Sequence, residues 1–293
     1  MIRLKQAYPH LAIKALCELF GKTRHAYYDR QWRNNSRHLE DDIVLQFVME
    51  IRSQLPCVGT RKLQFMLNPM LQEHGIQIGR DYLFDLLTQH KLLIRVRRRT
   101  AITTNSRHWM RKYNNMITDL TVDSPEQLWV SDITYIRMTN EFAYLSLITD
   151  AYSRKIVGFN LRRDLSTQGC LGGLQMAITA RTNIHHQLIH HSDRGSQYCC
   201  KEYVDLLTEN KIAISMTQNG DPYENALAER MNGIIKKEFK LYSSSLTLEE
   251  TKQRVATSIN SYNTIRPHGS CDYLTPQQAH QTKGPLKKRW KKD

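Results

Sequence analysis

The sequence lacks the features that mark secreted, zinc-ribbon and membrane proteins. Its six cysteines show no paired C-x-x-C spacing, so neither a disulfide framework nor a zinc ribbon is indicated. No apolar run approaches the roughly 20 residues that a helix needs to cross a bilayer, and nothing resembles a signal peptide. No low-complexity tract suggests wholesale disorder. We therefore expect a folded, reduced protein of the cytoplasm that does not contact a membrane.

Negative charge is also scarce. The 293 residues include 42 Lys and Arg against 28 Asp and Glu, which gives a formal net charge of +14. The excess is clustered rather than scattered: it gathers at 95–99 (RVRRR), at 236–240 and at 287–292. A solvated surface is the simpler interpretation of a basic chain, but clusters of this kind favour a polyanion, and nucleic acid is the commonest one.

The first third of the chain has the apolar spacing of helices. Residues 15–28 have the cadence of a helix-turn-helix: Gly21 permits a left-handed turn after the first helix, and Thr23 can cap the second. Many helix–glycine–helix corners bind nothing, so this pattern alone does not establish DNA binding.

A second helical unit is predicted further along. A helix at 60–67 would be stopped by the Asn68–Pro69 pair, because the residue before a proline is pushed out of the helical region, and another helix would follow at 80–90. The basic run after it favours contact with DNA. We therefore assign residues 1–99 to an all-α, helix-turn-helix DNA-binding region, with these candidate DNA contacts: Arg97, Arg98 and Arg99.

Residues 100–125 are polar and weakly periodic, which predicts a linker. Beyond them, strands are predicted at 128–138, 142–150, 155–161, 187–192 and 212–216, and helices at 166–181, 197–210, 225–240 and 248–262. Three strands on short connections, followed by alternating helices and strands, predict an α/β fold: a ribonuclease-H-like mixed sheet with flanking helices. We place this core at 126–282 and a basic tail at 283–293.

Three acids fall where this architecture brings the ends of its elements together. Asp132 lies inside the first strand, Asp193 ends an apolar strand, and Glu229 lies one turn into a helix. An acid in an apolar strand is costly unless it is paired or binds a metal. Mg²⁺ (or Mn²⁺) prefers carboxylate oxygens, and two such ions can support phosphoryl transfer on DNA. We therefore name the trio as catalytic residues and as ligands of two divalent ions.

The spacing and surroundings of the acids add to this interpretation. Asp132 and Asp193 are separated by 60 residues, Asp193 and Glu229 by 35, and Lys236 follows Glu229 by seven. The surrounding motifs are 129–136 (WVSDITYI), 147–158 (LITDAYSRKIVG), 191–198 (HSDRGSQY), 224–232 (ENALAERMN) and 262–268 (YNTIRPH) with 275–276 (TP). Together they resemble the DDE pattern of retroviral-type integrases and, over nearly the whole chain, the OrfB product of the IS3 family of insertion sequences.

The resemblance implies an integrase core that cuts DNA at the ends of its element and joins the freed 3′-hydroxyl to target DNA. It also implies a homo-oligomer on DNA, an upstream-frame partner or fusion, and a place in the bacterial cytoplasm, associated with the nucleoid. On helical geometry Asn225, Asn232 and Lys236 share one face with Glu229, and we expect Lys236 to contact DNA near the cleaved phosphate. Arg230 points elsewhere and is expected to contact the DNA backbone; all four are candidate DNA contacts. Segments 56–62 and 269–273 depart from the family pattern.

Other interpretations stay open at this point. Asp150 also ends an apolar strand, but its neighbours favour a turn in which it bonds Ser153 or Arg154. Of the adjacent pair His190 and His191, we expect one buried and one exposed. The main alternative function is a catalytically silent DNA-binding relic of a transposase. A tyrosine-type recombinase could use Arg266 and His268, but the chain lacks the dispersed Arg and His set of that class.

Overall fold

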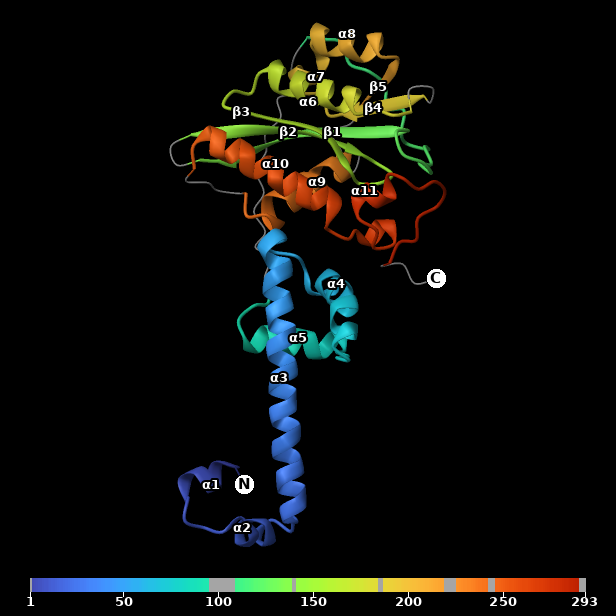
Figure 1. The fold of residues 1–293 in the computed structure, drawn as a ribbon. Helices are drawn as coiled ribbons and strands as arrows, with labels where there is room; N and C mark the ends of the chain where they lie inside the picture. Colours follow the sequence, from blue (N-terminus) through green and yellow to red (C-terminus); the bar gives the residue numbers. More distant parts are fainter. Residues whose placement is uncertain are drawn as a thin grey trace.

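The computed structural model describes residues 2–94, 109–138, 141–183, 187–218, 225–241 and 246–289, with only the backbone of residues 2, 3 and 33–36. Arg97, Arg98 and Arg99 lie outside these ranges. The molecule is elongated. A sheet covered by helices on both faces lies at one end of a long helix, α3 (Arg24–Gln54), which we call the stem helix; shorter helices lie beside it and at its far end (Figure 1). None of the described helices is both long and apolar enough to cross a membrane.

The N-terminal helices form around the predicted turn. Their bounds are α1 (Ile2–Ala7), α2 (Ile13–Leu19), α3 (Arg24–Gln54), α4 (Thr60–Glu73) and α5 (Arg80–Gln89). Gly21 has a φ of 60° after α2, and the Thr23 hydroxyl accepts a hydrogen bond of 3.1 Å from the Ala26 N–H at the start of α3. Both features of the predicted helix–turn–helix corner are confirmed, because a left-handed turn needs glycine and a first-turn N–H needs a cap.

The predicted stop at Asn68–Pro69 is wrong. Helix α4 runs through Pro69 to Glu73 and ends before Gly75, which has a φ of 68°. Leu63, Leu67 and Leu71 are all fully buried along one side of the helix. This apolar stripe continues past the proline, and its burial outweighs the one backbone hydrogen bond that proline cannot donate.

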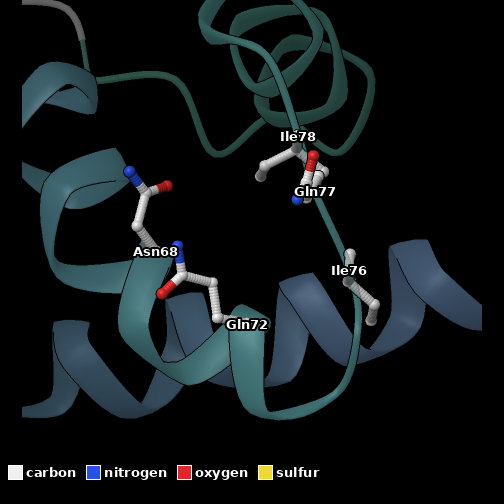
Figure 2. A pocket seen from close by; sticks show the side chains of 5 residues that line it. All are labelled: Asn68, Gln72, Ile76, Gln77 and Ile78. Carbon is white, nitrogen blue, oxygen red and sulfur yellow. The ribbon is translucent and has the colours of Figure 1, made fainter.

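A small hollow of about 220 Å³ lies beside α4. The turn after the helix folds back over its last turns and closes one side of the hollow (Figure 2). Its lining is Asn68, Gln72, Ile76, Gln77 and Ile78. None of the residues predicted to carry chemistry or bind DNA contributes to it.

The sheet has five strands in the order β3-β2-β1-β4-β5. Their bounds are β1 (Leu128–Arg137), β2 (Phe142–Asp150), β3 (Ile156–Arg162), β4 (Leu188–Ser192) and β5 (Ile212–Met216). Strands β1, β2 and β3 form an antiparallel meander, whereas β4 runs parallel to β1 and β5 parallel to β4. The predicted mixed sheet of the ribonuclease-H type is therefore confirmed.

Helices cover both faces of the sheet. One face carries α6 (Thr167–Thr179), α7 (Ser196–Cys199) and α8 (Lys201–Glu209); the other carries α9 (Ala226–Glu238) and α10 (Leu248–Thr264) (Figure 1). The short elements η2 (Gly269–Cys271) and α11 (Pro276–Ala279) complete the described chain near its end. The two-sided cover explains why strands β1, β2 and β4 carry long runs of buried residues.

The predicted single helix at 197–210 is instead two helices. The chain is extended at Cys200, with φ −69° and ψ 153°, between α7 and α8. Tyr198 and Tyr203 are both almost fully buried and meet edge to face, with ring centroids 5.4 Å apart. On one continuous helix, residues five apart would point to different sides, so the break lets both rings enter the same core.

Residues 109–125, within the predicted linker, contain no helix or strand but pack against the sheet. The Met116 N–H donates to the Ser215 hydroxyl at 2.9 Å, and the Met216 N–H reaches the Asn114 carbonyl at 3.4 Å. Ile117 and Val122 pack on the apolar cluster at the start of β1. This stretch therefore follows the edge of the sheet beside β5.

A buried polar cluster joins the start of β1 to the end of β2. Asp150 accepts hydrogen bonds from the Ser153 N–H and hydroxyl at 2.8 and 2.7 Å, which confirms its predicted structural role. Burial disfavours the ionised form of Glu126, but the His280 imidazole 3.7 Å away and hydrogen bonds from two backbone N–H groups lower its pKa to about 2. Burial opposes the charge on His280 too, yet the carboxylates of Asp150 and Glu126, 3.8 and 3.7 Å from its ring nitrogens, raise its pKa above 6.5.

These shifts predict how stability depends on pH. Because the pKa of His280 is raised on folding, His280 stabilises the protein fully below its ordinary pKa of 6.5, and this contribution disappears as the pH rises through the raised value. We expect His280→Ala to lower the free energy of unfolding at about pH 6 and to cost clearly less at about pH 9. Urea denaturation at both pH values measures the difference, with the exposed His38→Ala variant as control. A cost that is the same at both pH values would contradict the assignment.

Candidate active site

Strand register brings two of the three predicted acids together. Strands β1 and β4 run parallel with Val130 opposite His191. Two residues further along both strands, Asp132 and Asp193 are therefore level with each other. Asp193 follows directly on Ser192, the last residue of β4.

Each aspartate is held by short hydrogen bonds. One oxygen of Asp132 accepts from the Ile133 N–H at 2.8 Å, and the other accepts from the Asn232 amide at 2.8 Å. Asp193 accepts from the Gly195 N–H at 2.9 Å. Because a carboxylate oxygen has two lone pairs, these bonds orient the groups without exhausting their capacity to accept.

The electrostatics of Asp132 reflect its neighbours. Its pKa is raised to about 7, chiefly by burial and then by the negative charge of Asp193, while the hydrogen bonds from Ile133 and Asn232 oppose the shift. The charge of Glu229, in the first turn of α9, adds a smaller increase. All three acids are therefore close enough to interact electrostatically with one another, and their negative charges repel.

The three acids do not form a complete set of metal ligands in this structure. In the described part of the chain, no three His, Cys, Asp or Glu side chains converge closely enough to hold a metal ion. Asp132 and Asp193 form the inner pair, whereas the Glu229 side chain is exposed to solvent. A hard divalent cation fits this donor set, because the set consists of carboxylates and because a cation relieves the repulsion within the pair.

Two asparagines of the α9 segment support the acid strand. Asn225 is 6% exposed and donates to the Ser131 carbonyl at 3.1 Å, and Asn232 is 5% exposed and donates to Asp132. These bonds fix α9 on β1 and orient the carboxylate. The sequence places both residues beside Glu229 but gives no sign of these bonds, because the partners are about 100 residues away. Their predicted contact with DNA stays a prediction.

Lys236 is also engaged with β1. Its ammonium group donates to the Thr134 hydroxyl at 3.1 Å and lies 4.1 Å from the centre of the Tyr135 ring. Burial lowers its pKa, as does the neighbouring charge of Lys237, while Asp132 opposes that shift. Arg230 is exposed. The position of Lys236 near Asp132 is compatible with a role at the scissile phosphate, and both predicted DNA contacts stay predictions.

The expectation of one buried and one exposed histidine is wrong. His190 and His191 are 1% and 0% exposed, because β4 lies inside the sheet, between β1 and β5. His190 bonds the Ser131 hydroxyl at 2.7 Å, and burial lowers its pKa to about 3. His191 bonds the Ser215 hydroxyl at 2.8 Å. Both imidazoles pin neighbouring strands rather than presenting ligands.

The residues of the recombinase alternative are also structural. Arg266 is 2% exposed and makes two hydrogen bonds of 2.7 Å with Glu238. His268 is 7% exposed and bonds the Ser270 hydroxyl at 2.7 Å. Neither side chain is available to a DNA phosphate, so the tyrosine-recombinase interpretation has no site in the described residues.

Known proteins resemble this chain over most of its length. Models of the integrase core domain match residues 122–222 and 210–276. An insertion element IS600 protein of 31 kDa from Shigella sonnei is 30% identical over 266 residues, covering 89% of this chain and 96% of that protein. The transposase InsF for insertion sequence IS3A of Escherichia coli is 26% identical, covering 91% and 93%. A putative transposase for IS986/IS6110 of Mycobacterium tuberculosis is 29% identical, covering 85% and 91%.

Solved structures give a weaker likeness. The catalytic core domain of HTLV-2 integrase in complex with magnesium has a TM-score of 0.43 at 18% identity and covers 54% of this chain and 98% of that one. A simian T-cell lymphotropic virus intasome in complex with PP2A subunit B56 gamma has a TM-score of 0.48 at 18% identity, with 78% and 74% covered.

The contacts of Asp132 predict opposite effects for two substitutions in metal-free buffer. Asp193→Asn removes a negative charge and should lower the pKa of Asp132, whereas Asn232→Ala removes a donor and should raise it. Carboxyl carbon NMR over a pH titration measures both, with the exposed Asp205→Asn as control. Shifts of the same sign in the two variants would show that the paired geometry is wrong.

Proposed function

Because this chain belongs to the IS3-family insertion-sequence transposases with an integrase core, we propose that it is a DDE-type transposase that cuts DNA at the ends of its element and transfers the freed strand to a second DNA. The observation that carries the proposal is that Asp132 and Asp193 each follow the Val130–His191 pair of β1 and β4 by two residues, with Glu229 in electrostatic range on α9. Half-buried acids placed this close together destabilise a fold unless a positively charged partner binds them.

The trio would hold divalent ions. Asp132, Asp193 and Glu229 are hard oxygen ligands that suit Mg²⁺ or Mn²⁺, and we infer two ions per site. When bound, such ions supply the positive charge that phosphodiester cleavage and strand transfer require. Glu229 is exposed at the start of α9, so its side chain would turn toward the aspartates to complete the ligand set.

The chain's own residues would orient the reactants. Asn232 holds Asp132 in one orientation and Asn225 holds the strand that carries it. Below about pH 7, Asp132 retains a proton, so the site carries less negative charge and its affinity for cations falls. Lys236, on the same face of α9 as Glu229, and Arg230, next to Glu229 in the chain, would contact DNA, where positive charge offsets the approaching phosphates.

The helical region would bind the element ends, aided by the basic run before residue 100. We expect the protein to act as a homo-oligomer on DNA in the bacterial cytoplasm, with the product of an upstream frame as a further partner. These expectations rest on the family and on the net charge of +14, which favours a polyanionic partner.

Neutralising any of the three acids tests the proposed site. Asp132→Asn, Asp193→Asn and Glu229→Gln should each reduce nicking of plasmid DNA that carries the element ends by roughly 100-fold or more. Each substitution removes a negatively charged ligand of the metal ions that would stabilise the transition state. End-DNA binding should stay unchanged, and EDTA should abolish nicking by the wild type. Glu209→Gln on α8 is the matched control.

Two outcomes would decide against the proposal. A trio variant that nicks at the wild-type rate in Mg²⁺ would show that the site is elsewhere. A wild-type protein that binds the ends with normal affinity but never nicks them would identify the chain as the catalytically silent relic.

The basic run predicts the salt dependence of DNA binding. Counterion release makes the logarithm of the affinity fall with log salt by about 0.9 per phosphate contacted. Replacing Arg97, Arg98 and Arg99 by alanine should therefore weaken binding and flatten this slope by up to about 2.7. Fluorescence anisotropy over a salt series measures the slope, with Lys211→Ala, in the turn between α8 and β5, as control. An unchanged slope would place the DNA surface elsewhere.

A further inference from the structure

A residue of the N-terminal helical region hydrogen-bonds to the last turn of α9. A helix leaves its final carbonyl groups without partners in its own backbone. The carbonyl of Glu238, the last residue of α9, accepts a hydrogen bond of 2.9 Å from the Cys57 N–H. Cys57 lies in the short connection between α3 and α4. A segment some 180 residues earlier in the chain therefore completes the end of the helix that carries Glu229.

The side chain of Glu238 is held from two sides. Arg266 makes two bonds of 2.7 Å with it from just beyond α10, and Lys62 on α4 lies 3.6 Å from one of its oxygens. Burial disfavours the ionised form of Glu238, but the two cations, Arg266 first, lower its pKa. One carboxylate thus links α9, the end of α10 and the helical region.

Apolar contacts accompany these bonds. Leu55 and Val58, on either side of Cys57, are 2% and 0% exposed and belong to a cluster that also includes Ile235 and Phe239 of the α9 segment. Phe65, one turn beyond Lys62, stacks on Tyr273 with ring centroids 4.7 Å apart. Residues 55–65 therefore form the docking segment between the helical region and the core.

Of the two cations that contact Glu238, Lys62 is the one that can be replaced without leaving a buried charge unpaired. Arg266 is almost fully buried and already neutralises Glu238 with two short bonds. Lys62 keeps 23% of its side-chain surface exposed and makes the longer contact. Removing it leaves no buried charge unpaired, whereas removing Arg266 would. Its positive charge also faces the negative end of the α9 helix dipole.

We propose that Lys62 is a positioning residue that couples engagement of DNA by the helical region to the placement of Glu229. Helix α9 is 13 residues long and carries Glu229 near its start and Glu238 at its end, so a shift at one end moves the other. Asn232 and Lys236 lie between them and contact β1, so the same movement alters the orientation of Asp132. This inference rests on the proposed function.

The test separates binding from turnover in the full-length protein. Lys62→Ala should lower the nicking rate at saturating end DNA by about five- to tenfold, the effect of one charge-assisted contact, and leave the Kd for end DNA within about twofold. Lys62→Arg should restore the rate. Arg61→Ala removes the same charge from an exposed neighbour and should change neither quantity beyond about twofold.

A second readout does not need activity. Hydrogen exchange of the α9 amides should be slowed by end DNA in the wild type, and Lys62→Ala should remove most of that protection while Arg61→Ala keeps it. Equal exchange in the wild type and Lys62→Ala would overturn the coupling. So would a Lys62→Ala variant that loses affinity but nicks normally at saturation, since Lys62 would then be a DNA contact. If the wild type never nicks, the proposed function fails and the exchange result alone decides the coupling.

Discussion

The repulsion between a carboxylate inside β1 and a carboxylate just beyond the end of β4 is the constraint on which the candidate site depends. Asp132 and Asp193 are brought level by the parallel register of β1 and β4, and burial together with mutual repulsion raises the pKa of Asp132 to about 7. Their geometry persists because hydrogen bonds from Ile133 and Asn232 hold one acid and Gly195 the other. The site therefore stores unfavourable electrostatic energy that a cation can release.

Helix α9 is the second element on which the site depends. It is anchored at its start through Asn225, in its middle through Asn232 and Lys236, and at its end through Glu238. The first anchors are contacts with β1, and the last is shared with the helical region. One 13-residue helix thus connects β1, the strand that carries Asp132, with a segment that precedes the core.

Local patterns in the sequence predict much of this architecture. The strands, the corner at Gly21 and Thr23, and the role of Asp150 depend on neighbours in sequence, and the structure confirms them. The features that sequence analysis missed depend on distant partners. Pro69 stays in a helix because buried leucines continue past it, and Cys200 breaks a helix because two tyrosines share one core. The sequence singled out the three acids, and the structure brings them within electrostatic range of one another. The bonds of Asn225 and Asn232, whose partners lie across the fold, could not be predicted.

The stem helix has a geometric consequence for the reach of the molecule. Arg37 packs over the Tyr82 ring, 5.0 Å from its centre, and beyond that contact α3 continues for 13 residues toward Arg24 (Figure 1). Those residues span about 20 Å. A tilt of about 10° over that length would displace the tip by about 3.4 Å, the rise of one DNA base pair along each strand. The helix-turn-helix corner could then be offset by one base-pair step while every contact in the core stays in place.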